Sequence, residues 1–283
     1  MSSIFSEKYG DVFKNLRLQK NISLSRLSKL SSVSKATISQ FENGNSMVSY
    51  EKLERMLEVL HLTLLDYSLI INNGTPEYFI AKFQEIETAY YNNDLNTLAY
   101  LYESCAAYPE LEYIALSAKS AYKCLSDIEI LSIKKFFSNN PFWGQFEFYV
   151  LIHTIEQLPI DYVWLTIKKI FEDPFIKSYF TVLHEYRALI INIIIKACLV
   201  FIQGNDEDKA TITLQNLKQL SSNSDLTTLI ILEILEGSFI YKFHDKTKGS
   251  DIIDKMLYTM TELNAIKLRD SIKRRIEKLL IDE

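Results

Sequence analysis

Glycine and proline are scarce in this chain, which has only 7 Gly and 5 Pro in 283 residues. An all-β or α/β protein of this length needs many tight turns and glycine-rich loops, so the scarcity argues against both classes. With 48% hydrophobic and 24% charged residues, the chain has the composition of a folded globular protein. The composition therefore favours an all-helical protein with enough apolar residues for two packed domains.

Close pairs of cysteines are also missing, because Cys105, Cys124 and Cys198 are dispersed among apolar neighbours. Metal and redox motifs need such pairs, so we expect buried thiols of a cytosolic protein. The four histidines are scattered, and the sequence has neither a nucleophile elbow nor a glycine loop that could cradle a phosphate. We therefore expect no enzymatic activity, no metal and no cofactor.

The sequence has no evident secretory or membrane-spanning segment. Its first residues lack a basic stretch followed by an apolar core. The longest apolar stretch runs from Ala188 to Ile202, is interrupted by Asn192 and Lys196, and is shorter than the roughly 20 residues needed to span a bilayer. We expect this stretch to be a buried helix, and we expect a cytoplasmic protein without membrane association.

Negative charge predominates, but its distribution is uneven. The net charge of the chain is −5, whereas residues 1–66 carry nine Lys/Arg against seven Asp/Glu. A phosphate-binding face, if there is one, is therefore local and lies near the N-terminus.

Residues 8–70 have the pattern of five short helices. The first is expected at about residues 8–20. Ser23, Ser34 and Ser49 are good N-cap residues for the next three, and Thr63 with Asp66 has the spacing of a capping box for the fifth. The residues predicted to face the core are Val12, Phe13, Leu16, Leu24, Leu27, Leu30, Ile38, Phe41, Leu53, Leu57 and Leu60.

Residues 71–76, Ile-Asn-Asn-Gly-Thr-Pro, combine turn formers with a proline at a plausible helix start, so we place a linker there between domains 1–70 and 77–283.

Later helix breaks recur at intervals that give helix pairs of about 32–36 residues, the period of tetratricopeptide-like repeats. The match is to the period only, because the Trp and Gly consensus positions are absent. We predict a five-helix phage-repressor-like domain followed by a tetratricopeptide-like α-solenoid, whose concave groove would suit an extended peptide.

Residues 24–44 resemble the helix-turn-helix of phage-repressor-type regulators. Ser28 is small enough for two helices to cross, Val33 fills the turn, and Gly44 can end the second helix with a positive φ. The departure is Ser31-Ser32, which occupies the turn where a glycine is common, and it suggests a somewhat different turn.

The helix after Ser34 is the predicted recognition helix, and its outward residues can pair with base edges in a major groove. Lys14 and Arg17 on the first helix, and Ser34 with the helix amides, suit phosphates. The alternative is that Lys35 and Gln40 are merely solvated, and it is disfavoured because the pattern agrees over all of residues 24–44. With few basic groups, we expect a homodimer that reads two half-sites about 34 Å apart on double-stranded DNA. The predicted DNA-binding residues are Lys14, Arg17, Ser34, Lys35, Ala36, Thr37 and Gln40.

Two stretches of the larger domain narrow the family. Residues 142–149, Phe-Trp-Gly-Gln-Phe-Glu-Phe-Tyr, and residues 187–192, Arg-Ala-Leu-Ile-Ile-Asn, resemble motifs of the Rgg/GadR/MutR regulators, as does Leu235-Glu236-Gly237. The resemblance implies a cytosolic homodimeric transcription factor whose repeat domain binds a short, hydrophobic signalling peptide. Glu147 and Arg187 of these motifs are expected to form a structural ion pair.

Four residues are candidates for the ligand pocket: Trp143, Tyr149, His153 and Asn192. Tyr149 and His153 lie four apart on one helix face, and Asn192 needs a hydrogen-bond partner, which a peptide amide could supply. The alternative is that Asn192 bonds to a neighbouring helix and that Trp143 and Tyr149 belong to the core.

Two other functions remain open at this point. One is a protein-interaction scaffold that uses its helix-turn-helix for dimerisation, and the other is a helical-repeat hydrolase or phosphatase. Salt-dependent binding to DNA would separate the regulator from both.

Overall fold

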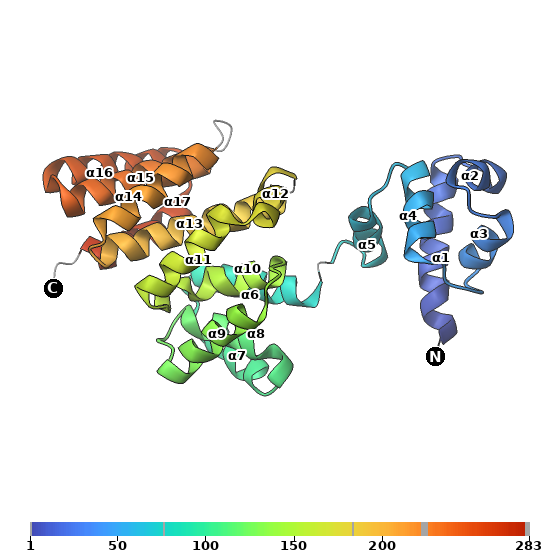
Figure 1. The fold of residues 1–283 in the computed structure, drawn as a ribbon, viewed down its shortest axis with the longest axis horizontal. Coiled ribbons are helices and arrows are strands. Elements are labelled where there is room, and N and C mark those ends of the chain that lie inside the picture. Colours follow the sequence, from blue (N-terminus) through green and yellow to red (C-terminus); the bar gives the residue numbers. More distant parts are fainter. Residues whose placement is uncertain (1, 76, 183, 222–225, 281–283) are drawn as a thin grey trace. The chain divides into compact units, whose positions relative to one another are not determined.

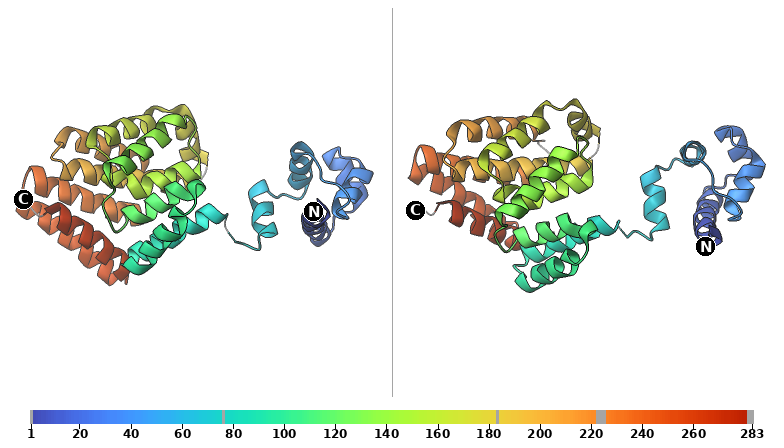
Figure 2. Two further views of the ribbon diagram at one scale, coloured as in Figure 1. Left: turned by 90° about the horizontal axis from the view of Figure 1, so that it is seen from below. Right: turned by 60° about the horizontal axis from the view of Figure 1, so that its bottom comes forward.

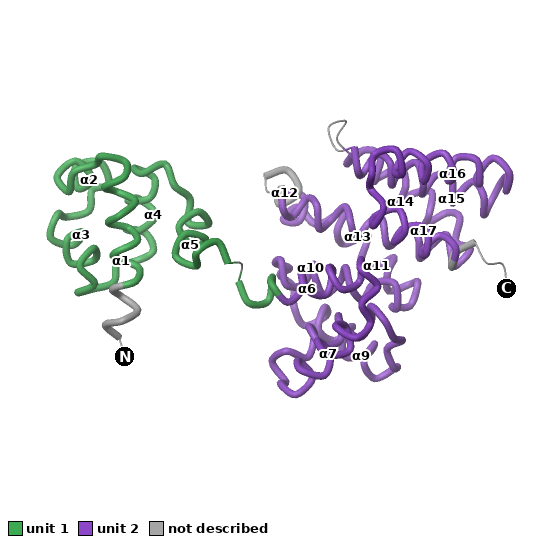
Figure 3. Tube along the Cα trace, turned by 180° about the vertical axis from the view of Figure 1, so that it is seen from behind, with its two compact units in different colours: residues 1–81 green, residues 82–283 purple. Residues whose placement is uncertain are grey.

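A computed structural model describes residues 2–75, 77–182, 184–221 and 226–280 of the chain. Across these residues the secondary structure consists of α-helices and two 3-10 turns, without strands (Figure 1). The chain divides into two compact units, residues 1–81 and 82–283 (Figure 3). The predicted all-α class is confirmed, while the placement of the linker at 71–76 stays a prediction.

Unit 1 consists of short helices that begin where the sequence supplies capping residues. They are α1 (Ser2–Gln19), α2 (Leu24–Ser31), α3 (Lys35–Glu42), α4 (Tyr50–Val59) and α5 (Leu64–Ile71). The side chains of Ser23, Ser34 and Thr63 accept backbone N–H groups at the starts of α2, α3 and α5, and Asp66 completes the capping box with Thr63. Ser49 precedes α4 but makes no side-chain cap bond. α1 begins earlier than the expected residue 8.

The core of unit 1 is formed by one apolar stripe from each helix. Phe13, Leu27, Ile38 and Leu60 are fully buried, as predicted. Leu30 was predicted to face the core as well, but it is 56% exposed. The buried face of α2 is narrow and contains Leu27 and Ser31, which lie four residues apart. Leu30, three residues after Leu27, lies beyond the edge of this face and points to solvent.

Unit 2 begins at Lys82, inside α6, and continues as an array of helices. Its elements are α6 (Tyr78–Tyr91), α7 (Leu95–Ala106), η1 (Pro109–Leu111), α8 (Glu112–Ser120), α9 (Asp127–Asn139), α10 (Gln145–Thr154), η2 (Ile155–Gln157), α11 (Ile160–Glu172), α12 (Pro174–Val182), α13 (His184–Gln203), α14 (Glu207–Leu220), α15 (Leu226–Phe243), α16 (Lys246–Glu262) and α17 (Ile266–Leu280). Consecutive helices pair as α7 with α8, α13 with α14, and α15 with α16.

Asparagine ends several helices of unit 2 by adopting a left-handed backbone. Asn93, Asn205 and Asn264 have φ values of 56°, 56° and 57° after α6, α13 and α16. Asparagine tolerates this conformation better than most residues, so it ends a helix without glycine.

The apolar helix α13 lies at the centre of unit 2. It packs against α10, α11, α12, α14, α15 and α17 (Figure 2). Ile193, Ile194 and Phe201 are fully buried, which confirms the predicted buried helix over Ala188–Ile202. No helix in the described part of the chain is long and apolar enough to cross a membrane.

The cysteines are free thiols, but they are not all buried as expected. Cys105 and Cys198 are buried within helices α7 and α13, whereas Cys124 is exposed. Cys124 lies in the loop between α8 and α9. Among the residues that the structure describes, no group of three or more His, Cys, Asp or Glu side chains is placed to hold a metal ion.

Candidate DNA-binding face and ligand cavity

Helix α3 has one side anchored in unit 1 and one side open. Ile38 and Phe41 are buried at 0% and 1% exposure, and the Phe41 ring packs against Phe13 with centroids 5.5 Å apart. Lys35 and Gln40 are exposed on α3. A short, anchored helix with exposed polar residues near its N-terminus is the arrangement that reads base edges in a major groove.

Three further predicted DNA-binding residues surround the start of α3. Ser34 and Ala36 are exposed, and Thr37 is half-buried. The Ser34 hydroxyl accepts the Thr37 N–H at 3.1 Å and shares a hydrogen bond with the Thr37 hydroxyl at 2.8 Å. These bonds fix the helix start, and they leave the Ala36 methyl group and the Lys35 ammonium facing outward.

In the turn before α3, a serine adopts the left-handed backbone conformation that is usually taken by glycine. Ser32 adopts φ 58° and ψ 23°, in the left-handed region. The neighbouring Ser31 hydroxyl donates to the Leu27 carbonyl at 2.8 Å and accepts the Val33 N–H at 3.3 Å. Ser31 thus stabilises the turn locally, and the backbone takes the conformation that a glycine would supply.

Arg17 was predicted to bind DNA phosphate, and the structure corrects this assignment. Its side chain is 6% exposed and makes a bidentate ion pair with Glu42, with Nε–Oε1 at 2.6 Å and Nη2–Oε2 at 2.8 Å. Nη1 donates to the Ile22 carbonyl at 2.6 Å, and the hydrogen bond to Glu42 raises the pKa of Arg17. Arg17 therefore holds the end of α3 against α1, while half-buried Lys14 remains the phosphate-binding candidate on α1.

Gly10 brings α1 unusually close to α3. A Cβ atom at Gly10 would lie 1.8 Å from the Phe41 carbonyl oxygen. No side chain fits in that space, so the crossing of the two helices requires glycine at this position. Sequence reasoning considered the crossing of α2 and α3 at Ser28, and it did not identify the crossing of α1 and α3 at Gly10.

A small cavity in unit 2 brings together two of the predicted ligand residues. It has a volume of about 40 Å³. Residues from α6, α8, α10, η2, α13 and α17 line it. Its charged residues, together with His153 and Asn192, are Glu87, Glu156, Lys196 and Arg275. His153 and Asn192 therefore face one space although they come from different helices.

His153 is held by ring stacking rather than by hydrogen bonds from its imidazole. Its ring stacks on Phe83 with centroids 5.7 Å apart, and Tyr149 stacks on the same Phe83 ring at 5.0 Å. The Nε2 atom is buried and has no hydrogen-bond partner among the described residues. Burial, with a smaller effect of Lys196, holds the pKa of His153 well below 6.5, so the imidazole is neutral at pH 7.

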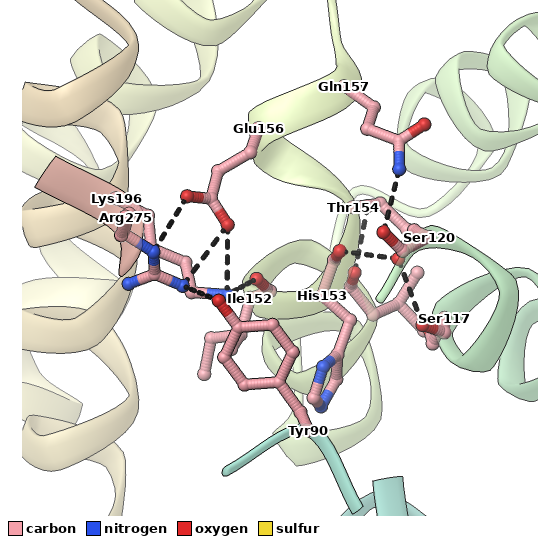
Figure 4. Close-up of polar contacts among 11 residues, drawn as sticks. Tyr90, Ser117, Ser120, Ile152, His153, Thr154, Glu156, Gln157, Lys196 and Arg275 are labelled. Atoms are coloured by element: carbon pink, nitrogen blue, oxygen red, sulfur yellow. Dashed lines mark hydrogen bonds and ion pairs between the residues drawn. The ribbon is translucent and has the colours of Figure 1, made fainter. Parts of the chain in front are cut away.

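Charged side chains from distant parts of the chain converge beside His153 (Figure 4). Glu156 binds Lys196 at 3.4 Å and Arg275 at 3.2 Å. Lys196 also donates to the Ile152 carbonyl at 2.7 Å, and Arg275 donates to the Tyr90 hydroxyl at 3.2 Å. This cluster joins η2, α13, α17 and α6, and none of its members was predicted.

Trp143 was predicted to contact the ligand, but it belongs to the core instead. It is 4% exposed, its indole N–H donates to the Asn140 carbonyl at 3.1 Å, and its ring packs against Phe137 and Phe148. Tyr149 is half-buried and is not among the residues that line the cavity; its ring stacks on Phe83, which also stacks on His153.

The expected ion pair between Glu147 and Arg187 stays a prediction. Glu147 accepts the Gly144 N–H at 2.8 Å in a capping interaction at the start of α10. Arg187 donates to the Leu220 carbonyl at 2.9 Å.

The two units match known protein families. The helix-turn-helix family model matches residues 13–67, and the model of the C-terminal domain of the HTH-type transcriptional regulator Rgg matches residues 81–274. No curated protein is similar to the chain in sequence.

Solved structures share the fold over nearly the whole chain. The SHP pheromone receptor Rgg2 of Streptococcus dysgalactiae superposes with a TM-score of 0.75 at 19% identity, covering 95% of this chain and 99% of its own. A proposed transcriptional regulator of Listeria monocytogenes EGD-e has a TM-score of 0.76 at 16% identity and covers 97% of both chains. Bacillus thuringiensis PlcR, solved with the peptide PapR7 and DNA, has a TM-score of 0.64 at 15% identity and covers 98% of this chain and 100% of its own.

The fold and the anchored α3 define a helix-turn-helix protein with a large helical C-terminal unit. The Rgg C-terminal model spans more than half of the sequence, and the chain belongs to the Rgg family of HTH-type transcriptional regulators. The resemblance noted in the motifs at 142–149 and 187–192 is thereby confirmed.

Proposed function

We propose that this regulator binds double-stranded promoter DNA as a homodimer through α3 and responds to a short hydrophobic peptide bound in unit 2. The proposal of DNA binding rests on one observation, that α3 has a buried apolar side and an exposed polar side. Its apolar side is fully packed, while Lys35, Ala36 and Gln40 are exposed on the other side. Such a helix can enter a major groove without repacking.

The peptide part rests on the family and on the ligand cavity. S. dysgalactiae Rgg2 is described as a pheromone receptor, and PlcR has been solved with both a peptide and DNA. In this chain we assign His153 and Asn192 to ligand contact because both line the cavity, and Tyr149 because it shares the Phe83 ring with His153. A protein that regulates promoters acts where the chromosome is, so we infer a cytoplasmic location.

DNA binding is tested by fluorescence anisotropy on a duplex from upstream of the protein's own gene. Lys35→Ala combined with Gln40→Ala should abolish the preference for this duplex over a scrambled one, because each bidentate base contact contributes about 1–3 kcal/mol of discrimination. Helical circular dichroism should be unchanged. Lys52→Ala, at an exposed position on α4, is the matched control and should keep the preference. A preference that survives the double substitution would contradict the assignment of α3.

Peptide binding is tested by isothermal titration calorimetry with short hydrophobic peptides encoded near the gene. We expect at least one of them to bind and to change the anisotropy titration with promoter DNA. Binding of none of these peptides would contradict the peptide part and leave the DNA part intact.

A further inference from the structure

Unit 1 carries a groove that does not involve the predicted recognition helix. The groove has a volume of about 980 Å³. In the described part of the chain, its lining comes from the end of α1, from α2, from α4 and from the turns after these helices, with no residue of α3. Helices α2 and α4 pack against each other beside it. A partner bound in this groove therefore need not touch α3.

The groove is positively charged, and we call it the cationic groove. Lys20, Arg26 and Arg55 line it, and Glu58 is the one carboxylate among its described lining residues. Arg55 also pairs with Glu51 one turn earlier on α4, but both side chains are exposed and such a pair holds Arg55 only weakly. The excess of cations favours a partner that carries negative charge.

The cationic groove also contains an apolar side chain that the chain leaves open. Leu30 is 56% exposed, although the apolar pattern of α2 predicts that it faces the core, and the half-buried Ile22 and Val59 line the same groove. Apolar side chains gain free energy when a partner removes them from water, and a phosphate backbone offers them no apolar surface. Leu30 therefore favours a protein partner over DNA.

The two helices of the cationic groove present the same pair of groups. Arg26 precedes Leu30 by four positions on α2, and Arg55 precedes Val59 by four positions on α4. Each helix thus offers a cation and an apolar side chain on one face. A partner with carboxylates and apolar side chains at the same spacing is an acidic amphipathic helix. The volume of the groove is comparable to roughly two turns of an α-helix taken as a cylinder about 10 Å across.

We propose that the cationic groove binds an acidic amphipathic helix of a partner protein. Carboxylates of that helix pair with Arg26 and Arg55, and its apolar side chains cover Leu30 and Val59. The proposal goes beyond the proposed function and does not depend on it, because it uses neither α3 nor the ligand cavity of unit 2.

Fluorescence anisotropy of the full chain with a labelled helical peptide tests the proposal. The probe has about 15 residues, the length at which an isolated helix begins to be stable, and each of its glutamates is followed four positions later by a leucine. We expect saturable binding that weakens as the salt concentration rises. Peptides with lysine in place of glutamate, or with glutamine in place of leucine, should bind at least about tenfold more weakly. No saturable binding of the acidic peptide, or equal binding of the lysine peptide, would overturn the proposal.

Two variants of the chain locate the peptide in the cationic groove. Arg26→Glu and Leu30→Ser should each weaken binding of the acidic peptide by about tenfold or more. Lys29→Glu makes the same charge change on α2 outside the lining, and Leu18→Ser removes an exposed leucine of α1, so both controls should bind the peptide as the wild type does. Helical circular dichroism should be the same for all four variants, because each substituted residue is exposed. If the groove variants bound the peptide no more weakly than their controls, the peptide would lie elsewhere and the proposal would be wrong.

Two further measurements distinguish the partner helix from DNA and from a second copy of the chain. Arg26→Glu should weaken binding to the promoter duplex no more than Lys29→Glu does, because the two substitutions change the charge equally. A larger loss would mean that the groove contacts phosphates. Sedimentation should show the same oligomeric state for Leu30→Ser and the wild type, whereas a smaller assembly would mean that a second copy covers the groove. Either result would overturn the proposal and would leave the assignment of α3 to the major groove standing.

Discussion

At the scale of single residues, the ion pair of Arg17 and Glu42 determines how α3 is held. Both side chains are almost completely buried, at 6% and 3% exposure. Removing one partner of such a pair leaves an uncompensated charge in the interior, whereas replacing both with apolar side chains is often neutral. The pair therefore contributes to the orientation of α3 even where its net stabilisation is small.

Arg17→Met should lower the free energy of unfolding of unit 1 by about 3–5 kcal/mol. Urea denaturation followed by circular dichroism measures the loss. The double variant Arg17→Met with Glu42→Leu should recover much of it. Lys14→Met, at a half-buried position on the same helix, should change the stability by about 0.5 kcal/mol or less. If Arg17→Met weakened DNA binding with no loss of stability, Arg17 would be a phosphate contact after all.

His153 gives the stability of unit 2 a pH dependence of predictable sign. Its pKa in the folded chain is well below 6.5, mainly because of burial, so the unfolded chain binds the proton more readily. The stability linked to a neutral His153 is therefore fully present above pH 6.5, and it decreases as the pH falls from 6.5 toward the folded-state pKa of His153. Glu87, whose pKa burial raises, contributes in the opposite direction, and Glu156, Lys196 and Arg275 also face the cavity.

Comparison of the wild type with His153→Phe isolates the histidine contribution. Thermal unfolding measured between pH 7.5 and pH 5.5 should show a smaller decrease for the variant, because Glu87 and the other charged groups are common to both proteins. Parallel pH profiles of the two proteins would show that His153 titrates normally when folded.

At the scale of elements, α17 is fastened to helices that lie far away in the sequence. Arg275 binds Glu156 of η2 and the Tyr90 hydroxyl of α6, and Lys267 donates to the Asn92 side chain at 2.9 Å. These contacts span up to 185 positions of the chain. The last helix is thereby tied to the first helix of unit 2.

Arg275→Met should loosen α17 more than it affects the rest of unit 2. The loss should be about 1–2 kcal/mol, below the value for a fully buried pair, because the side chains of Arg275 and Glu156 are 21% and 33% exposed. Hydrogen exchange should become faster for the amides of α17 than for those of α13. Lys273→Met, at an exposed position on α17, is the control and should leave exchange unchanged. Equal acceleration in both helices would mean that α17 does not open separately.

Local sequence patterns predict the elements well, and they fail where distant residues meet. Ser23, Ser34 and Thr63 were identified as caps because a cap depends only on the next three residues. Arg17 was misassigned because its partner Glu42 lies 25 positions away, and a cationic side chain on a helix surface looks the same in the sequence whether it is free or paired. Asn192 was predicted from its polarity within an apolar helix, and His153 from its spacing with Tyr149, but the cluster around Glu156 has no local pattern.

At the scale of the whole molecule, the correction at Arg17 reduces the positive charge available for DNA. Lys14 and Lys35 remain as the predicted cationic contacts of each protomer. Binding should therefore depend on salt with a modest slope, since each neutralised phosphate contributes about −0.9 to the slope of log K against log salt.

Lys14→Ala should reduce the magnitude of that slope by about 1 for each protomer bound. The effect should be equal for the promoter duplex and for a scrambled duplex, because a phosphate contact carries no sequence information. Anisotropy titrations over a range of salt concentrations measure both. A slope that did not change would mean that Lys14 lies off the duplex, and a change confined to the promoter would make it a base contact.

The serine turn before α3 has a consequence for how such domains are recognised and engineered. Ser32 stays in a backbone region that costs a non-glycine residue about 1–2 kcal/mol. A sequence motif that requires glycine between α2 and α3 would miss this domain, although Ser32 adopts the backbone conformation that glycine would supply. Ser32→Gly would relieve that strain in the folded state, which raises the free energy of unfolding. It would also give the unfolded chain more conformational freedom, which lowers the free energy of unfolding. Variation at this turn can thus change the stability of unit 1 while the exposed residues of α3 stay the same.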